Sequence, residues 1–159
     1  MRYQTWVSGM IAGALAYAVV AVFFAVANMV VGQSPFHTAL LLGRAIGAEG
    51  PGPGGVEGPI LAANGLHVLL SLAVGVAASW LVEQLEHQHA IWFAVLLAFL
   101  LGFFLSIVAV GMLAAEIGGV ATWPQVTVAN VLAAAVIGGY LGKAHPGLVS
   151  SIRREIEVD

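Results

Sequence analysis

Four long stretches of this chain contain no Asp, Glu, Lys or Arg, and polar segments separate them. They cover about residues 6–31, 59–82, 90–114 and 125–142. A transmembrane helix needs roughly 20 predominantly apolar residues. We therefore predict four transmembrane helices, of which the second opens at Pro59 and the fourth is the shortest.

The segments between these stretches differ in length and composition. In segment 32–58, the first part (about 35–46) begins with a Ser-Pro pair, which is typical of a helix start, and its apolar residues suit an amphipathic helix lying on the membrane surface. The second part (about 47–58) is rich in Gly and Pro and predicts a flexible linker. Residues 83–89 predict a short turn, and residues 143–159 form a C-terminal tail.

Most of the basic residues fall on one side of the predicted helices. Four of the five lie beside the termini and one lies in segment 32–58; they are Arg2, Lys143, Arg153, Arg154 and Arg44. Lys and Arg favour the cytoplasmic side, so we expect both termini there and the long segment outside. Interfacial aromatic residues at the same helix ends agree, namely Trp6, Trp80, Trp92 and Tyr140. We therefore expect a multi-pass protein of the bacterial inner (cytoplasmic) membrane.

The composition supports an integral membrane protein. The chain has 159 residues, of which 60% are hydrophobic and 8% charged, whereas an average soluble domain is about 25% charged. We expect one all-α membrane domain over residues 1–159, folded as a four-helix bundle. The chain has no cysteine, which excludes disulfides, iron–sulfur clusters and thiolate zinc sites. A rival interpretation of the first stretch is a signal-anchor cleaved near Ala25–Ala27.

Small residues recur four positions apart in three of the four stretches. The pairs are Gly9 and Gly13, Gly75 and Ser79, and Gly138 and Gly142. Such spacing lets helix backbones approach closely in lipid, so we expect these pairs to pack the chain's own bundle, with a dimer interface as the alternative. Equal spacings of eight residues, from His67 to Gly75 and from Asn130 to Gly138, also hint that the first and second pairs of helices are repeats.

Polar side chains within the predicted spans gather in the outer half of the membrane. Asn64 and His67 are three residues apart and share one helix face, with His67 roughly 10 Å below the outer helix end. The others are Asn28, Ser106, Thr127 and Asn130. Because an unpaired polar group in lipid is costly, we expect them to face one another. The rest of the helix cores are expected to be nearly pure hydrocarbon.

Three hypotheses account for this cluster. It is a hydrogen-bonded network that fixes helix register, or a cofactor site formed by Asn64, His67 and Asn130, or a contact for a quinone or a proton path. A neutral imidazole can ligate haem iron or a pigment metal. A bis-histidine haem would need a second membrane-level histidine, which the sequence lacks, and a proton path usually needs buried carboxylates.

Other candidate sites are weaker. Glu83 and His87 have a spacing that suits a metal on a helix, but a solvated turn is the favoured interpretation. Glu116 is expected in an outer loop, where a solvated carboxylate is favoured over one that caps the outer polar cluster or pairs with Arg44. The Gly-rich segment lacks the lysine of a phosphate-binding loop, and no nucleophile–base arrangement or nucleic-acid-binding basic run is present.

The function expected by exclusion is that of a non-catalytic accessory subunit of a larger bacterial membrane complex. A respiratory complex of the haem–copper oxidase or nitric oxide reductase type is the leading expectation, with other integral-membrane subunits, including redox subunits, and lipid as partners. The alternative is a membrane protein that binds a haem, pigment or quinone around His67. A third hypothesis is a small-solute channel or transporter.

Overall fold

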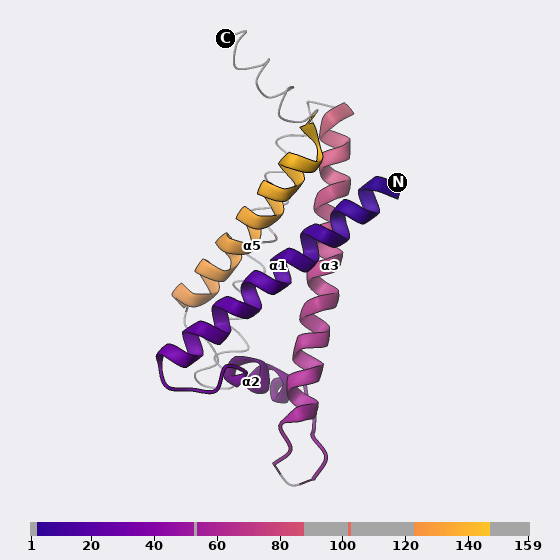
Figure 1. Cartoon of the computed structure of the whole chain (residues 1–159). Helices are drawn as coiled ribbons and strands as arrows, with labels where there is room; N and C mark the ends of the chain where they lie inside the picture. Colours follow the sequence, from indigo (N-terminus) through magenta and orange to yellow (C-terminus); the bar gives the residue numbers. More distant parts are fainter. Residues whose placement is uncertain (1–2, 53, 88–101, 103–122, 147–159) are drawn as a thin grey trace.

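The computed structural model describes residues 3–52, 54–87, 102 and 123–146, and is helical with connecting turns over these residues (Figure 1). Its helices are α1 (Tyr3–Val30), α2 (His37–Ala45), α3 (Glu57–His87) and α5 (Trp123–Ala144). Three of them, α1, α3 and α5, are long and apolar enough to cross a membrane. They correspond to the first, second and fourth predicted spans. The third, at about 90–114, lies outside the described residues apart from Gly102, as does the tail beyond residue 146.

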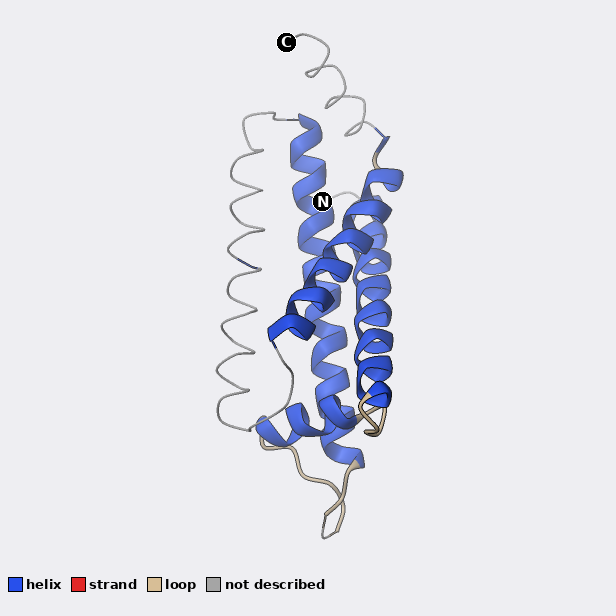
Figure 2. Cartoon of the chain, turned by 90° about the vertical axis from the view of Figure 1, so that its left-hand side faces the viewer, coloured by secondary structure: helices blue, strands red, loops and turns tan. Residues whose placement is uncertain are grey.

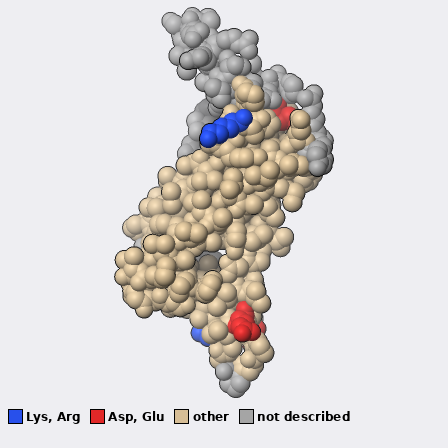
Figure 3. Space-filling view, viewed as in Figure 1, with Lys and Arg blue, Asp and Glu red and all other residues tan. Residues whose placement is uncertain are grey.

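Helix α1 is the common partner of the other long helices. It crosses α3 and packs against it, and it also packs against α5, whereas α3 and α5 touch each other little (Figure 1). Helix α2 lies across one end of the bundle, where it packs against α3 (Figure 2). The coloured acidic and basic side chains of the described residues lie toward the two ends of the molecule, and a broad band without them separates the ends (Figure 3). This band fits the predicted membrane-spanning region.

Glycine allows the backbones of α1 and α3 to touch where the helices cross. A Cβ added to Gly9 would lie 2.5 Å from Val76 Cα, and one added to Gly13 would lie 2.7 Å from Leu72 Cα. Gly75 meets Gly13 in the same way, at 2.7 Å from its Cα. No real Cβ fits at such distances, so any larger residue would force the helices apart. The predicted role of these small residues within the bundle is confirmed here.

The corresponding pair in α5 behaves differently. A Cβ at Gly138 or Gly142 would meet no atom within 4 Å in the described part of the chain. The face of α5 that does become buried carries Val126, Ala129 and Leu141. The prediction that this glycine pair packs the bundle is therefore not confirmed over the described residues.

Helix α2 confirms the short helix predicted at about 35–46, and two glycine caps frame it. Gly32 and Gly47 have φ values of 75° and 76°, which favour glycine. After α2, Gly47 N donates to Arg44 O at 3.0 Å and Ala48 N to Gly43 O at 3.0 Å. These two hydrogen bonds define a Schellman cap. The same pattern ends α1 at Gly32.

The predicted turn at 83–89 is wrong as far as His87, because α3 continues through it. Glu83, Gln84 and Leu85 are all good helix formers. Leu85 is 3% exposed, and Glu83 accepts a hydrogen bond from α1. Packing against α1 therefore favours about one and a half further helical turns over a solvated loop.

The Gly- and Pro-rich segment after α2 makes close backbone contacts in its described part. Gly50 and Gly55 approach so closely that a Cβ on Gly50 would lie 2.5 Å from Gly55 C. Gly43 of α2 likewise packs on the backbone of Pro59, in the first turn of α3. The flexibility expected of this segment stays a prediction. Its course is set by backbone contacts that only glycine permits.

Candidate functional site

Asn64 and His67 share one helix face, as predicted, and both contact Tyr17 of α1, which was not part of the predicted cluster. The Tyr17 hydroxyl donates a hydrogen bond to Asn64 Oδ1 at 3.1 Å. The ring of Tyr17 meets the imidazole of His67 edge to face, with centroids 5.2 Å apart and an interplanar angle of 71°. Asn64 Nδ2 donates to Ile60 O at 2.8 Å, within its own helix. These three side chains form what we call the Tyr17 group.

The crossing of α1 and α3 explains why a tyrosine fits at this point. Close backbone contact at Gly13 brings the two helices together, and from there they diverge toward α2 (Figure 1). Tyr17 is one helical turn beyond Gly13, where the wider gap admits an aromatic ring. A phenol inside an apolar helix needs a hydrogen-bond partner, and Asn64 supplies it.

The imidazole of His67 keeps hydrogen-bonding capacity that the described chain does not use. No hydrogen bond to either ring nitrogen forms within the part of the chain that the structure describes. The buried side-chain nitrogen and oxygen atoms described there all have partners, so the half-buried His67 ring is not sealed inside the protein. Leu70 and Val74, on the same side of α3, are 56% and 55% exposed. His67 therefore lies at the border between the α1 contact and an exposed apolar surface.

Over the described residues, Asn28 forms a group separate from that of Asn64 and His67. Asn28, 6% exposed, accepts from Thr38 Oγ1 at 3.0 Å and donates to Pro35 O at 3.2 Å, so it ties α2 to the end of α1. Asn130 lies on α5, where its Nδ2 donates to Val126 O at 2.9 Å. The contacts of Tyr17 bring Asn64 and His67 together, whereas Asn130 belongs to the other partner helix of α1. Its cofactor-binding role stays a prediction.

The two remaining members of the predicted cluster have different outcomes. Ser106 lies outside the described residues. Thr127 is exposed on α5.

A second polar group lies nearer the opposite end of the bundle, and sequence reasoning missed it. Ser8 Oγ and Ser79 Oγ are 2.7 Å apart, and Thr5 Oγ1 donates to Glu83 Oε2 at 2.7 Å. The expectation of nearly pure hydrocarbon outside the outer cluster is therefore wrong. A usable signal was present, because Thr5 and Ser8, like Ser79 and Glu83, have spacings that place them on one helix face. Tyr17 carried a similar signal as a lone phenol within an apolar span.

The weaker candidates gain no support as metal sites. Among the residues that the structure describes, no group of three or more His, Cys, Asp or Glu side chains could hold a metal ion. Glu83 instead accepts the hydrogen bond from Thr5. Glu116, the suggested partner of Arg44, lies outside the described residues.

Comparisons with known proteins provide no further guide to this site. The chain matches no protein-family model, no curated protein and no solved structure. The functional argument therefore rests on the geometry of the Tyr17 group and of its surroundings.

Proposed function

We propose that this chain is a non-catalytic subunit of a larger integral-membrane complex and that it contacts a partner subunit through the His67 side of α3. The observation that carries the proposal is the imidazole of His67, which has no hydrogen bond to its nitrogens in the described chain. In hydrocarbon such a group needs a partner. Ionisable side chains inside membranes usually face other protein or a cavity rather than lipid.

The surface beside His67 suits a second transmembrane helix. Leu70 and Val74, which share the helix face of His67, are both more than half exposed. Apolar side chains pack equally well against lipid and against another apolar helix, so they do not select a partner. A hydrogen bond to His67 does select one, since it requires a polar group at a defined depth. Such bonds contribute about 0.6–2 kcal/mol in membranes, enough to fix register while packing supplies the rest.

We further propose that this larger complex is a bacterial respiratory complex of the haem–copper oxidase or nitric oxide reductase type. This proposal rests on the sequence-based expectation that a small membrane protein with few charged residues is an accessory subunit of such a complex. The proposed role is to cover the lipid-facing side of a larger subunit and stabilise it. Identifying the subunits that accompany this chain tests this assignment directly.

A second candidate function uses the same imidazole to bind a quinone, haem or pigment. The accessible ring nitrogens favour it, since neutral imidazole can accept or donate a hydrogen bond and can ligate a metal. Tyr17 and Asn64 would orient the ligand-binding side of α3 in this case. The two functions differ in what accompanies the purified protein, either another polypeptide or a small molecule.

Native mass spectrometry of the protein extracted gently from its own membranes tests the proposal. The wild type is compared with His67→Phe, which keeps a ring against Tyr17 but removes both nitrogens, and with Leu69→Phe as a control on an exposed face of α3 that points away from His67. We expect the wild type and the control to travel with larger subunits and His67→Phe to lose them. A lone chain, or a homo-oligomer carrying a small bound mass, would overturn the subunit assignment. An intact assembly in His67→Phe would overturn the role of His67.

A further inference from the structure

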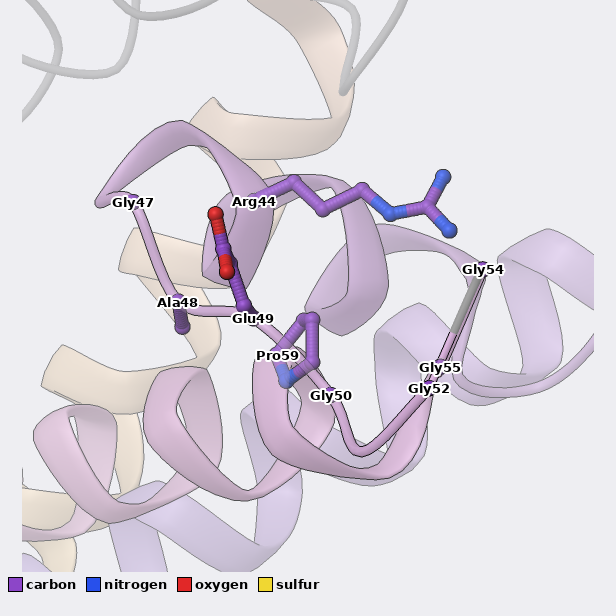
Figure 4. A pocket seen from close by; sticks show the side chains of 9 residues that line it. All are labelled: Arg44, Gly47, Ala48, Glu49, Gly50, Gly52, Gly54, Gly55 and Pro59. Carbon is purple, nitrogen blue, oxygen red and sulfur yellow. The ribbon is translucent and has the colours of Figure 1, made fainter.

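A hollow of about 430 Å³ lies at the α2 end of the molecule, separate from the Tyr17 group. It is bounded by the end of α2, the following loop and the first turn of α3 (Figure 4). Its lining consists mostly of glycines of this loop, together with Arg44, Glu49 and Pro59. The only charged side chains in this set are Arg44 and Glu49.

The walls of the hollow are built by backbone contacts. The Schellman cap at Gly47 turns the chain out of α2. Gly43 packs on Pro59 and so joins α2 to α3, while Gly50 and Gly55 close the loop on itself. Since a Cβ at Gly43, Gly50 or Gly55 would collide with backbone, the shape of the hollow depends on residues without side chains. This arrangement leaves the hollow open for a ligand.

Arg44 and Glu49 offer opposite charges at different places in the hollow. The guanidinium of Arg44 extends toward Gly54, while the carboxylate of Glu49 turns the other way (Figure 4). Both side chains are exposed. A ligand that carries both an anionic and a cationic group is complementary in charge to this pair. A guanidinium matches the geometry of a phosphate, and a carboxylate matches an ammonium group.

The position of the hollow favours a lipid over a free zwitterion. Its lining residues lie at the end of α2, which crosses the end of the helices that are long enough to span a membrane (Figure 1). Exposed apolar residues neighbour it in the chain, with Ile46 48%, Val56 43% and Leu61 71% exposed. A phospholipid presents charge at this level and hydrocarbon beside it, so one molecule can satisfy both the charged groups and the apolar rim.

We propose that the hollow binds the headgroup of a zwitterionic phospholipid that carries a primary ammonium group. The phosphate contacts Arg44 and the ammonium contacts Glu49. The acyl chains lie along the exposed side of the first turns of α3. This site is independent of the subunit function proposed for the His67 side of α3.

The test measures lipid selectivity in nanodiscs that contain phosphatidylethanolamine, phosphatidylglycerol and phosphatidylcholine in equal amounts. Native mass spectrometry of the released protein gives the bound lipid. The wild type is compared with Arg44→Ala, with Glu49→Gln, and with Glu57→Gln as a control carboxylate in the first turn of α3 outside the hollow. We expect the wild type and Glu57→Gln to prefer phosphatidylethanolamine over phosphatidylglycerol by about two- to fivefold, the size of an exposed charge pair.

The two variants at the hollow should differ in a specific way. Arg44→Ala should lower retention of all three lipids, because each carries a phosphate. Glu49→Gln should abolish or reverse the preference for phosphatidylethanolamine while keeping lipid bound, because only the contact to the ammonium group is lost. An unchanged preference in Glu49→Gln, or unchanged retention in Arg44→Ala, would overturn the site. Equal displacement of the lipid by soluble phosphoethanolamine would show that the ligand is a free zwitterion and overturn the choice of a lipid.

Discussion

Ser8 of α1 and Ser79 of α3 share a hydrogen bond, with 2.7 Å between their hydroxyl oxygens, inside the contact of the two helices. Ser79 is completely buried and Ser8 is 9% exposed. The bond lies directly beside the glycine contact, since Gly9 follows Ser8 and Gly75 precedes Ser79 by one helical turn. Small side chains thus serve two purposes here: they let the backbones touch, and their hydroxyls fix which turn of α1 faces which turn of α3.

Removing either hydroxyl should weaken this contact slightly, and the effects of the two removals should not be additive. Ser8 Oγ also donates to Gln4 O at 2.8 Å, so it keeps a partner when Ser79 is replaced. We expect Ser79→Ala and Ser8→Ala each to lower the free energy of unfolding by roughly 0.6 kcal/mol, the average for such bonds in membranes. The double variant should lose less than the sum of the two. Reversible unfolding in mixed micelles measures all three, and strict additivity would show that the bond contributes nothing.

Alanine at Gly75 should destabilise the protein, whereas alanine at Gly138 should not. The new Cβ at Gly75 would overlap the backbone of α1, and overpacking of this kind costs about 1–3 kcal/mol. At Gly138 nothing lies within 4 Å in the described part of the chain, so the helix propensity of alanine, about 1 kcal/mol better than glycine, should dominate. The same unfolding assay checks both variants. Equal effects at the two positions would contradict the close contact of α1 and α3.

Much of the fold could be predicted from the sequence because lipid imposes simple requirements. The absence of charge over about 20 residues predicted α1, α3 and α5, and a Ser-Pro start with apolar residues predicted α2. Four-residue spacing of small residues predicted the close contact at Gly9, Gly13 and Gly75. These signals are local, and each depends only on the composition or spacing within one helix.

The partners of these helices could not be predicted in the same way. The long helices are apolar on all sides, so no hydrophobic face marks which helix meets which. Asn64 and His67 were recognised as sharing a face, yet Tyr17 was missed because only the crossing of α1 and α3 brings it to them. The continuation of α3 past Glu83 was missed for a similar reason, since the hydrogen bond from Thr5 is a contact between distant residues.

Tyr17→Phe should separate the two contacts of the Tyr17 group. Phenylalanine keeps the ring against His67 but removes the donor to Asn64 Oδ1. Loss of one neutral hydrogen bond should cost about 0.5–1.5 kcal/mol. The assembly with larger subunits should persist in this variant, because the His67 nitrogens are untouched, and native mass spectrometry checks it. Loss of the assembly together with unchanged stability would assign the contact to the tyrosine hydroxyl rather than to the imidazole.

Asn28→Ala should release α2 from the end of α1. The Asn28 side chain accepts from Thr38 Oγ1 and donates to Pro35 O, and both Asn28 and Thr38 are buried. Truncation removes both bonds and leaves the Thr38 hydroxyl without this partner, at a cost of about 1–3 kcal/mol. Thr38→Val removes only one bond at nearly constant volume and should have the smaller effect.

Hydrogen exchange of the α2 amides measures the consequence of this release. Helix α2 also packs against α3 through Gly43 and Pro59, so it should remain helical but exchange faster when Asn28 is truncated. The long helices should be little affected, because the glycine crossing, where their backbones touch, lies away from α2. Faster exchange throughout α1 and α3 would instead mean that Asn28 supports the whole bundle. Unchanged exchange in α2 would mean that its contact with α3 alone holds it in place.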